Sequence, residues 1–486
     1  MGYVGIDLGT SAVKISYIDE EARILLSITK DYPICYPEEG WAEQNPEDWW
    51  DAIRQGMQEI VDAEVFTGLD AIGFGGQMHG LVALDVRGEV IRPAILWNDT
   101  RTAKETAILN TELGKEVLLK ETGNIAYAGF TAPKLLWMRT HEPERFAKIE
   151  HILLPKDYIL YRLSGEFSTD YSDASGTLLL NVAQRKWSKR MCDFCGVRPS
   201  QLPTLHESGD CVGKLRDEWC TLWGLDKAPD IVAGAGDNAA AAVSVGVVEE
   251  GDCNISLGTS GTIFMPTNRF LQDEHASLHA FADAAGKFHL MGCTLSAASC
   301  YKWWMGNVLQ RPENTSLSTE ESVRHHPLYF MPYLMGERSP LNDEDVRAGF
   351  LGLSSRSNWE QMIYAIYEGV AFSLRDCMAV AKNMGVTVNK ASIVGGGAQS
   401  RIWCQMIANV LQIPIAKPAG ECGPGYGAAL LAMAHKKGRS VREVAKQYAT
   451  FEEIFTPQPE EIPYYEEKYR KFSQLYPLLK DFYKGL

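Results

Sequence analysis

Several features are scarce or missing in this 486-residue sequence, and each excludes a class of protein. No hydrophobic run is long enough to cross a bilayer, and the Ala/Val-rich stretch 239–248 is far too short. Positive charge is in deficit, with 47 Lys and Arg against 62 Asp and Glu and a net charge of −15. An acidic surface argues against nucleic acid or an anionic membrane as a partner, although backbone amides can still bind a nucleotide phosphate.

A disulfide framework is also missing. The 11 cysteines are an odd number, and most stand alone in apolar segments. A strand begins by Tyr3 with no basic, apolar leader before it, so we expect reduced thiols and a cytoplasmic protein. The Cys-x-x-Cys at Cys192 and Cys195 leaves a zinc site with Cys211 and Cys220 as an alternative, although the spacing matches no common structural pattern.

Two familiar nucleotide-binding motifs are absent as well. No Gly-x-x-x-x-Gly-Lys-Ser/Thr occurs, because the Gly-Lys pairs at 114–115, 213–214 and 286–287 lack the hydroxyl residue that must follow. The His-Arg-Asp of the protein-kinase catalytic loop is missing too. A nucleotide site in this chain must therefore be built differently.

What the sequence does contain is an internal repeat. Residues 3–14, YVGIDLGTSAVK, and residues 254–263, NISLGTSGTI, both read as an apolar strand that runs into Leu-Gly-Thr-Ser and out into a second strand. Strands alternate with helices after each copy, and the length suits two domains. The pattern predicts a duplicated α/β fold with halves 1–245 and 246–486 and a ligand cleft between them.

Helix signals stand outside the repeat. Asn45 and Pro46 mark the cap and the first position of a helix. Ser357 and Glu360 predict a capping box before a long amphipathic helix. A C-terminal helix is expected to pack one face onto the body of the protein, and that face consists of Tyr465, Tyr469, Phe472, Tyr476 and Leu479.

The two Gly-Thr-Ser turns are candidate phosphate sites. Each offers unpaired N–H groups and two hydroxyls, which suit phosphate oxygens. One turn alone would more often be an ordinary hairpin tip. Two copies, at 9–11 and 258–260, together with the Gly-rich turn GGGAQS at 395–400, favour a nucleotide cleft.

Two carboxylates are the candidates for chemistry. Asp7 lies in the first apolar strand, where the second copy has Ser256. It either caps the turn or faces phosphates through Mg²⁺, which prefers one or two carboxylates with waters and phosphate oxygens. Asp237, in AGAGDNAAAA, is suited to capping a helix and also to accepting a proton from a hydroxyl, and both roles can hold at once.

These residues lie within a wider resemblance. The two hairpins resemble the phosphate motifs of actin, sugar kinases and heat-shock ATPases. GFTAPKLLWMRTH (129–141) and GFLGLSSRSNWEQMIYAIYEG (349–369) resemble the two signatures of the FGGY carbohydrate kinases. The likeness runs from residue 4 to beyond 425 through GGQMHGLVALD, LLPKDYILYRLSGEFSTDYSDASGT and YLMGERSP. It implies two ribonuclease H-like domains of the actin and hexokinase type, a sugar-binding one at 1–245 and an ATP-binding one at 246–486.

The same resemblance implies an activity and a set of site residues. The reaction would be ATP- and Mg²⁺-dependent phosphorylation of a ketopentose at its terminal hydroxyl, with D-xylulose giving D-xylulose 5-phosphate in a cytoplasmic homodimer. Asp237 would be the catalytic base and Asp7 the residue at Mg²⁺. Met78, His79, Asp237 and Asn238 would contact the sugar, although His79 by itself could simply cap a strand. The expected ATP site comprises Thr10, Ser11, Gly258, Thr259, Ser260, Ala297, Gly396, Gly397 and Arg401.

One departure from the family's motifs narrows the range of expected substrates. Gly76-Gln77-Met78-His79 stands where glycerol and several polyol kinases of the family carry Asn-Gln-Arg-Glu, which disfavours glycerol and favours a pentulose. A kinase for ribulose, another ketose or a pentitol stays open, as does a non-catalytic sugar or nucleotide sensor with the same cleft. A chaperone-type ATPase is an alternative on the fold alone.

Overall fold

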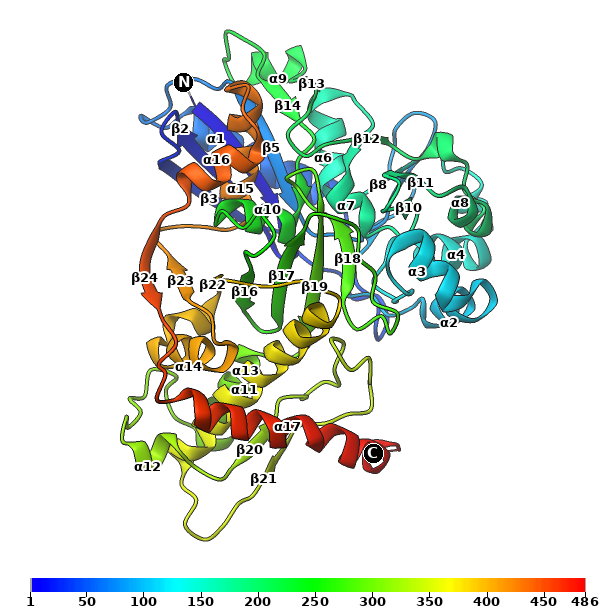
Figure 1. Cartoon of the computed structure of the whole chain (residues 1–486). Coiled ribbons are helices and arrows are strands. Elements are labelled where there is room, and N and C mark those ends of the chain that lie inside the picture. Colours follow the sequence, from blue (N-terminus) through cyan, green and yellow to red (C-terminus); the bar gives the residue numbers. More distant parts are fainter. Residues whose placement is uncertain (1, 486) are drawn as a thin grey trace.

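The computed structural model describes residues 2–485 and is organised by two seven-stranded sheets (Figure 1). The first has the order β13-β14-β5-β1-β2-β3, with β15 beside β5, and the second the order β18-β19-β17-β16-β22-β23-β24. The strands of the first sheet are β1 (Gly2–Leu8), β2 (Ala12–Asp19), β3 (Ile24–Asp31), β5 (Ala71–Gly76), β13 (Cys211–Lys214), β14 (Asp230–Val232) and β15 (Ala235–Gly236). Those of the second are β16 (Asn254–Leu257), β17 (Gly261–Thr267), β18 (His279–Ala282), β19 (Phe288–Thr294), β22 (Ala391–Val394), β23 (Ile415–Pro418) and β24 (Phe451–Phe455).

The two sheets repeat one topology. In each, an antiparallel hairpin, β1–β2 or β16–β17, carries the Gly-Thr-Ser turn at its tip. A third antiparallel strand, β3 or β19, extends the sheet on one side, and a parallel strand, β5 or β22, extends it on the other. The duplicated α/β fold predicted from the repeat is therefore confirmed.

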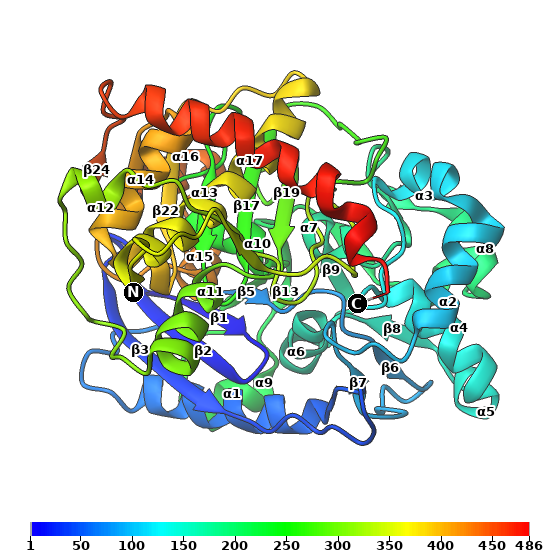
Figure 2. The ribbon, with the colours of Figure 1, turned by 90° about the horizontal axis from the view of Figure 1, so that it is seen from below.

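Helices cover both faces of the first sheet (Figures 1 and 2). On one face lies α1 (Pro46–Val61), which begins as predicted, with the Asn45 side chain accepting from the backbone N–H of Glu47. On the other face lies α15 (Pro424–Lys436), so close that a Cβ at Gly5 would come within 1.9 Å of the Gly425 carbonyl oxygen. Glycine at position 5 thus permits the helix to lie directly on β1.

The chain passes between the halves more than once. α15 and α16 (Val441–Tyr448) follow residue 246 in the sequence, yet α15 packs on the first sheet and α16 packs on α15 and on α10 (Asp237–Ser244). The last strand, β24, then returns to the second sheet. A division of the chain at 245/246 stays a prediction.

Further helices complete the two halves. The long helix α13 (Trp359–Asn383) has its capping box one residue later than predicted, between Asn358 and Gln361, because Glu360 instead accepts a hydrogen bond from the Ser318 N–H. The C-terminal helix α17 (Ile462–Tyr483) buries Tyr465 and Phe472 in the second core, as predicted. The other α-helices of the described residues are α2 (Ala103–Ile108), α3 (Lys115–Thr122), α4 (Thr131–His141), α5 (Pro143–Phe146), α6 (Pro155–Ser164), α7 (Tyr171–Ser175), α8 (Lys189–Cys195), α9 (Asp217–Leu222), α11 (Ala298–Trp303), α12 (Glu321–Arg324) and α14 (Arg401–Leu411).

Short strand pairs lie outside the main sheets. They are β4 (Glu43–Gln44) with β7 (Ala94–Ile95), β6 (Val82–Leu84) with β8 (His151–Leu153), β9 (Ser168–Asp170) with β12 (Thr204–His206), β10 (Leu180–Asn181) with β11 (Lys186–Trp187), and β20 (Tyr329–Met331) with β21 (Gly349–Leu351). Across residues 2–485, no helix combines the length and the apolar character needed to cross a bilayer.

Candidate active site

Two carboxylates, Asp7 and Asp237, leave the first sheet at the same edge. β1 and β15 both run parallel to β5, so Asp7 stands level with Gly75 and Gly236 stands level with Gly76. Asp7 lies near the end of β1, and Asp237 opens α10 directly after β15. The carboxyl ends of parallel strands are where open α/β sheets bind their ligands.

Both carboxyl groups are hard to ionise. Burial raises the pKa of Asp7 to about 7, and the negative charge of Asp237 adds to the rise, while Lys14 opposes it. Burial also raises the pKa of Asp237 to about 6, against hydrogen bonds from Asn238 that favour the charged form. Acids with pKa values this close to neutral are typical of sites that move a proton or bind a cation.

One carboxylate oxygen of Asp237 accepts hydrogen bonds within the protein, and the other is available to a ligand. Its Oδ1 accepts hydrogen bonds from the backbone N–H of Asn238 at 2.7 Å and from the Asn238 side chain at 2.8 Å. Gly236, not Asp237, occupies the N-cap position of α10, so the predicted capping role of Asp237 is wrong. Oδ2 therefore remains for a hydroxyl group of a ligand.

This geometry predicts an acid-side loss of activity. A base with a pKa of about 6 is ionised at neutral pH and becomes protonated as the pH falls through that value. We expect kcat/KM for the acceptor substrate to be nearly constant above about pH 7 and to fall about tenfold per pH unit well below pH 6. Initial rates in buffers of constant ionic strength give this profile. A flat profile down to about pH 5 would contradict an ionised Asp237 as the base.

A buried network lies behind the segment that carries Asp237. The N–H of Gly236 donates to Ser172 Oγ at 3.0 Å, and that hydroxyl donates to Asp170. Lys156 Nζ in turn lies 2.9 Å from Asp170 Oδ1, 2.6 Å from Asp157 Oδ1 and 3.7 Å from an oxygen of Asp173.

All four charged side chains of this network are fully buried. Burial lowers the pKa of Lys156, but the three carboxylates outweigh that effect and raise it above its usual value. Burial raises the pKa of Asp173 well above its usual range, and neither of its oxygens has a hydrogen-bond donor among the described residues. A charged Lys156 thus neutralises a carboxylate cluster directly behind the candidate base. The sequence reasoning did not identify these residues, although they lie in the segment LLPKDYILYRLSGEFSTDYSDASGT.

Met78 lies next to the segment that carries Asp237, and His79 follows it in the chain. A Cβ at Gly236 would lie 2.9 Å from Met78 Sδ, so Met78 contacts the residue before Asp237. His79 has a left-handed backbone, with φ 71°, and its Nδ1 lies 2.8 Å from the Gly176 carbonyl oxygen. Burial lowers the pKa of His79 to about 3, so its imidazole is neutral. The hydrogen bond to a backbone carbonyl in turn fixes which ring nitrogen carries the proton.

The second half places a cation near His79. The guanidinium of Arg338 lies 5.0 Å from the ring centre of Tyr127, and its charge contributes to the low pKa of His79. The preceding Glu337 accepts hydrogen bonds from the N–H groups of Leu295 and Arg338, both at 2.8 Å. Arg338 stands in the segment YLMGERSP, but nothing in the residues alone distinguished it from other arginines.

Hydrogen bonds from other elements fix the first Gly-Thr-Ser turn. The Tyr32 hydroxyl donates to the Gly9 carbonyl oxygen, and Gln44 donates to the Thr10 carbonyl oxygen at 2.7 Å. The Trp97 indole N–H donates to the Thr10 hydroxyl at 2.9 Å, and Ser11 is exposed at the tip. The turn is therefore held open next to Asp7.

The second turn borders a cavity of about 990 Å³. Gly258, Thr259, Gly396 and Gly397 all line it, as the sequence predicted for a nucleotide site. Aromatic side chains form much of the remaining wall, namely Tyr301, Trp303, Tyr367 and Trp403.

Three other residues predicted to bind the nucleotide do not line this cavity. Ala297 is buried behind the turn, where its N–H donates to the Thr259 carbonyl oxygen at 2.9 Å, and Ser260 is exposed beside Thr259. Arg401 opens α14, forms an ion pair with Glu453 and lines a neighbouring cavity. A contact between Arg401 and a nucleotide stays a prediction.

The alternative zinc site of the sequence analysis does not form. Cys192 and Cys195 are buried in α8 among apolar side chains, and burial raises the pKa of both thiols. In the part of the chain that the structure describes, these cysteines join no cluster of metal-ligating residues with Cys211 or Cys220.

Comparison with known proteins covers both halves. Residues 2–244 match the N-terminal domain of the FGGY family of carbohydrate kinases, and residues 253–435 match its C-terminal domain. The xylulose kinase of Escherichia coli (strain K12) is 38% identical over 485 residues, with 98% of this chain and 99% of the relative covered. That of Bacillus subtilis (strain 168) is 36% identical over 488 residues, with 98% and 97% covered.

Solved structures give the same picture. The crystal structure of a xyloylose kinase from Brucella ovis superposes with a TM-score of 0.95 at 35% identity, over 99% of this chain and 100% of the other. The xylulose kinase from Rhodospirillum rubrum superposes with a TM-score of 0.90 at 26% identity, over 100% of both chains.

Proposed function

This chain belongs to the FGGY family of carbohydrate kinases, and we propose that it transfers the γ-phosphoryl group of ATP to the terminal hydroxyl of D-xylulose, giving D-xylulose 5-phosphate. Its fold is the ribonuclease H-like, actin and hexokinase type expected from the motifs. The observation that carries the proposal is the meeting of Asp7, Asp237 and Met78 at one edge of the first sheet, where β1, β5 and β15 end. Kinases of other pentuloses and a non-catalytic sensor are not favoured, since the relatives in several species are xylulose kinases.

Asp237 supplies the base in this proposal. Oδ2 accepts the proton of the terminal hydroxyl as the hydroxyl oxygen forms its bond to the γ-phosphorus, and the bond from that phosphorus to the bridging oxygen of ADP breaks. Met78 and the neutral His79 bind the sugar beside Asp237, with Asn238 as a further contact. Arg338 offers a positive charge to the pocket from the second half, where it can stabilise the transferred group.

The nucleotide occupies the 990 Å³ cavity in the same proposal. The backbone of the second Gly-Thr-Ser turn and of the Gly-rich turn at 396–397 holds phosphate oxygens, and the first turn, with Thr10 and Ser11, approaches them from the other half. The aromatic wall is suited to a purine ring. This arrangement brings the γ-phosphate toward Asp237.

The oxygen donors at Asp7 fit Mg²⁺. Asp7 is a carboxylate whose pKa is raised to about 7 by burial and by the charge of Asp237, so a nearby cation would relieve the unfavourable charge. Asp7 would hold the ion on its carboxylate, directly or through water. Bound Mg²⁺ supplies neutralisation of phosphate charge. Asp7 itself orients the nucleotide phosphates toward the sugar.

Asp7→Asn tests this role. The amide keeps the size of the side chain and loses the charge, so the Mg²⁺ concentration for half-maximal activity should rise at least about tenfold. The KM for D-xylulose should change little, because Met78, His79 and Asp237 remain. The measurement is a Mg²⁺ titration at saturating ATP and sugar. Identical titrations for Asp7→Asn and the unaltered protein would exclude the metal role.

A coupled assay of ADP release tests the substrate assignment. D-xylulose should stimulate ADP release more strongly than D-ribulose, other ketoses, pentitols or glycerol at equal concentration. A strong preference for ribulose or glycerol would overturn the substrate but keep the kinase, whereas ADP release that no sugar stimulates would overturn both.

Assembly and location are predictions from the sequence. We propose a cytoplasmic homodimer whose chain divides at 245/246 into a sugar-binding and an ATP-binding domain. Light scattering behind a sizing column measures the assembly, and a mass near 54 kDa would contradict the dimer.

A further inference from the structure

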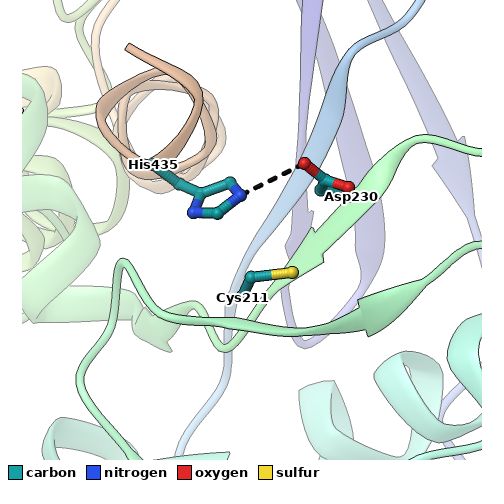
Figure 3. A group of neighbouring side chains, drawn as sticks. All are labelled: Cys211, Asp230 and His435. Carbon is teal, nitrogen blue, oxygen red and sulfur yellow. Dashed lines mark hydrogen bonds and ion pairs between the residues drawn. The ribbon is translucent and has the colours of Figure 1, made fainter. Parts of the chain in front are cut away.

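Three metal-ligating side chains from separate elements meet at an outer strand of the first sheet, away from Asp7 and Asp237. Cys211 lies on β13, Asp230 on β14 and His435 near the end of α15 (Figure 3). Their ligand atoms all lie within 4.8 Å of one another, and His435 and Asp230 face each other with the Cys211 sulfur nearby. We propose that Cys211, Asp230 and His435 bind a divalent ion of the zinc type.

A bulge in β13 places Cys211 on the same face of the sheet as Asp230. In the antiparallel pair β13–β14, Lys214 stands opposite Asp230 and Cys211 opposite Val232, with a bulge between Cys211 and Gly213. Without the bulge, side chains three residues apart on a strand would point to opposite faces. The extra residue brings Cys211 onto the face of Asp230, which is the face that α15 covers.

Asp230 and His435 are already about as far apart as two ligands of one metal ion. His435 Nε2 lies 3.2 Å from Asp230 Oδ2. In a tetrahedral zinc site with bonds of about 2.0–2.1 Å, neighbouring nitrogen and oxygen ligands are about 3.3–3.4 Å apart. Cys211 is exposed, and its thiol donates to the Gly213 carbonyl oxygen at 3.3 Å, so rotation of this side chain can bring Sγ to a metal held by the other two ligands.

The ligand chemistry selects the metal. A thiolate, an imidazole and one carboxylate form a mixed sulfur, nitrogen and oxygen set, which suits Zn²⁺ and disfavours Mg²⁺, an ion of all-oxygen sites. Water would take the fourth position. A metal there would tie the end of α15 to β13 and β14, and α15 is the helix that lies directly on β1.

Two lysines, Lys214 and Lys436, lie close to Asp230. Lys436 Nζ lies 2.9 Å from Asp230 Oδ2, and Lys214 Nζ lies 3.6 Å from Oδ1. Lys436 and His435 both hydrogen-bond the Asp230 carboxylate. The Lys436 side chain is 39% exposed and can turn into solvent when a metal takes its place. It therefore competes with the metal, which gives the proposal a distinctive test.

Titration of the full-length, metal-stripped protein with Co²⁺, in excess Mg²⁺ to saturate oxygen-only sites, tests the site. One equivalent should bind with a near-ultraviolet thiolate-to-cobalt band, and Zn²⁺ should displace it. Cys211→Ser should lose the band, and both Cys211→Ser and His435→Gln should bind at least about tenfold more weakly. Cys35→Ser removes another exposed thiol and should bind as the unaltered protein does.

Lys436→Met should strengthen metal binding, whereas the two ligand substitutions should weaken it. Loss of the competing ammonium should tighten Co²⁺ and Zn²⁺ binding at least about threefold, because a like charge beside the site is removed. The absence of a stoichiometric thiolate band, or a band that survives Cys211→Ser, would overturn the site. Unchanged or weaker binding by Lys436→Met would overturn Asp230 as a ligand and the three-ligand site with it.

Discussion

Asp237→Asn should lower kcat by about 10²-fold or more, the usual scale of a general-base contribution. The amide has the shape of the carboxylate and can keep its Oδ1 contacts with Asn238, so the sugar should still bind. What disappears is an oxygen able to take the hydroxyl proton at the moment of attack. Steady-state rates give kcat, and calorimetry with D-xylulose gives the affinity separately.

The control for Asp237→Asn is a carboxyl of similar character elsewhere. Burial raises the pKa of Asp376 to about 6 as well, but this residue lies on α13 and accepts a hydrogen bond from Tyr469 at 2.7 Å. Asp376→Asn keeps that acceptor and should leave kcat unchanged. Near-normal turnover by Asp237→Asn, or an equal loss in both variants, would remove Asp237 from the mechanism.

Lys156→Met should strongly destabilise the first half. It removes the one cation among Asp157, Asp170 and Asp173, all of them fully buried, and breaking a buried ion pair in this way costs about 3–5 kcal/mol of unfolding free energy. The cost should shrink in acid, because protonation of the carboxylates replaces the missing charge, and should grow as the pH rises. Urea denaturation at several pH values measures it.

An exposed lysine gives the comparison for Lys156→Met. Lys189 also pairs with a carboxylate, 2.6 Å from Asp193, but its side chain is 83% exposed. Lys189→Met should leave the denaturation midpoint unchanged. Equal midpoints for the two variants would show that the buried network adds nothing to stability.

Much of the fold could be predicted from local patterns in the sequence. Both Gly-Thr-Ser hairpins, the start of α1 at Asn45 and the packed face of α17 follow from periodicity and capping alone. The capping box of α13 was predicted one residue early, since Ser357 and Asn358 are both good caps and only the tertiary contact of Glu360 with Ser318 decides between them.

The remaining features of the site could not be predicted, because they depend on packing between segments far apart in the sequence. The sequence named Asp7 and Asp237 as candidates for the same site, but only the pairing of β1 and β15 with β5 shows how the two carboxylates come together. The carboxylates around Lys156 and the group of Cys211, Asp230 and His435 come from distant segments, and no spacing rule joins them. Arg401 directly follows the Gly-rich turn in sequence, yet its side chain pairs with Glu453 and lines a cavity next to the one that Gly396 and Gly397 line.

The most direct test of the account is the identity of the product. The protein should be incubated with ATP, Mg²⁺ and D-xylulose and followed by ³¹P NMR with proton–phosphorus correlation. The account predicts ADP together with one phosphomonoester, whose phosphorus couples to the methylene protons at C5 of the sugar. ADP with inorganic phosphate alone, or a phosphoester at another carbon, would contradict transfer to the hydroxyl that Asp237 deprotonates.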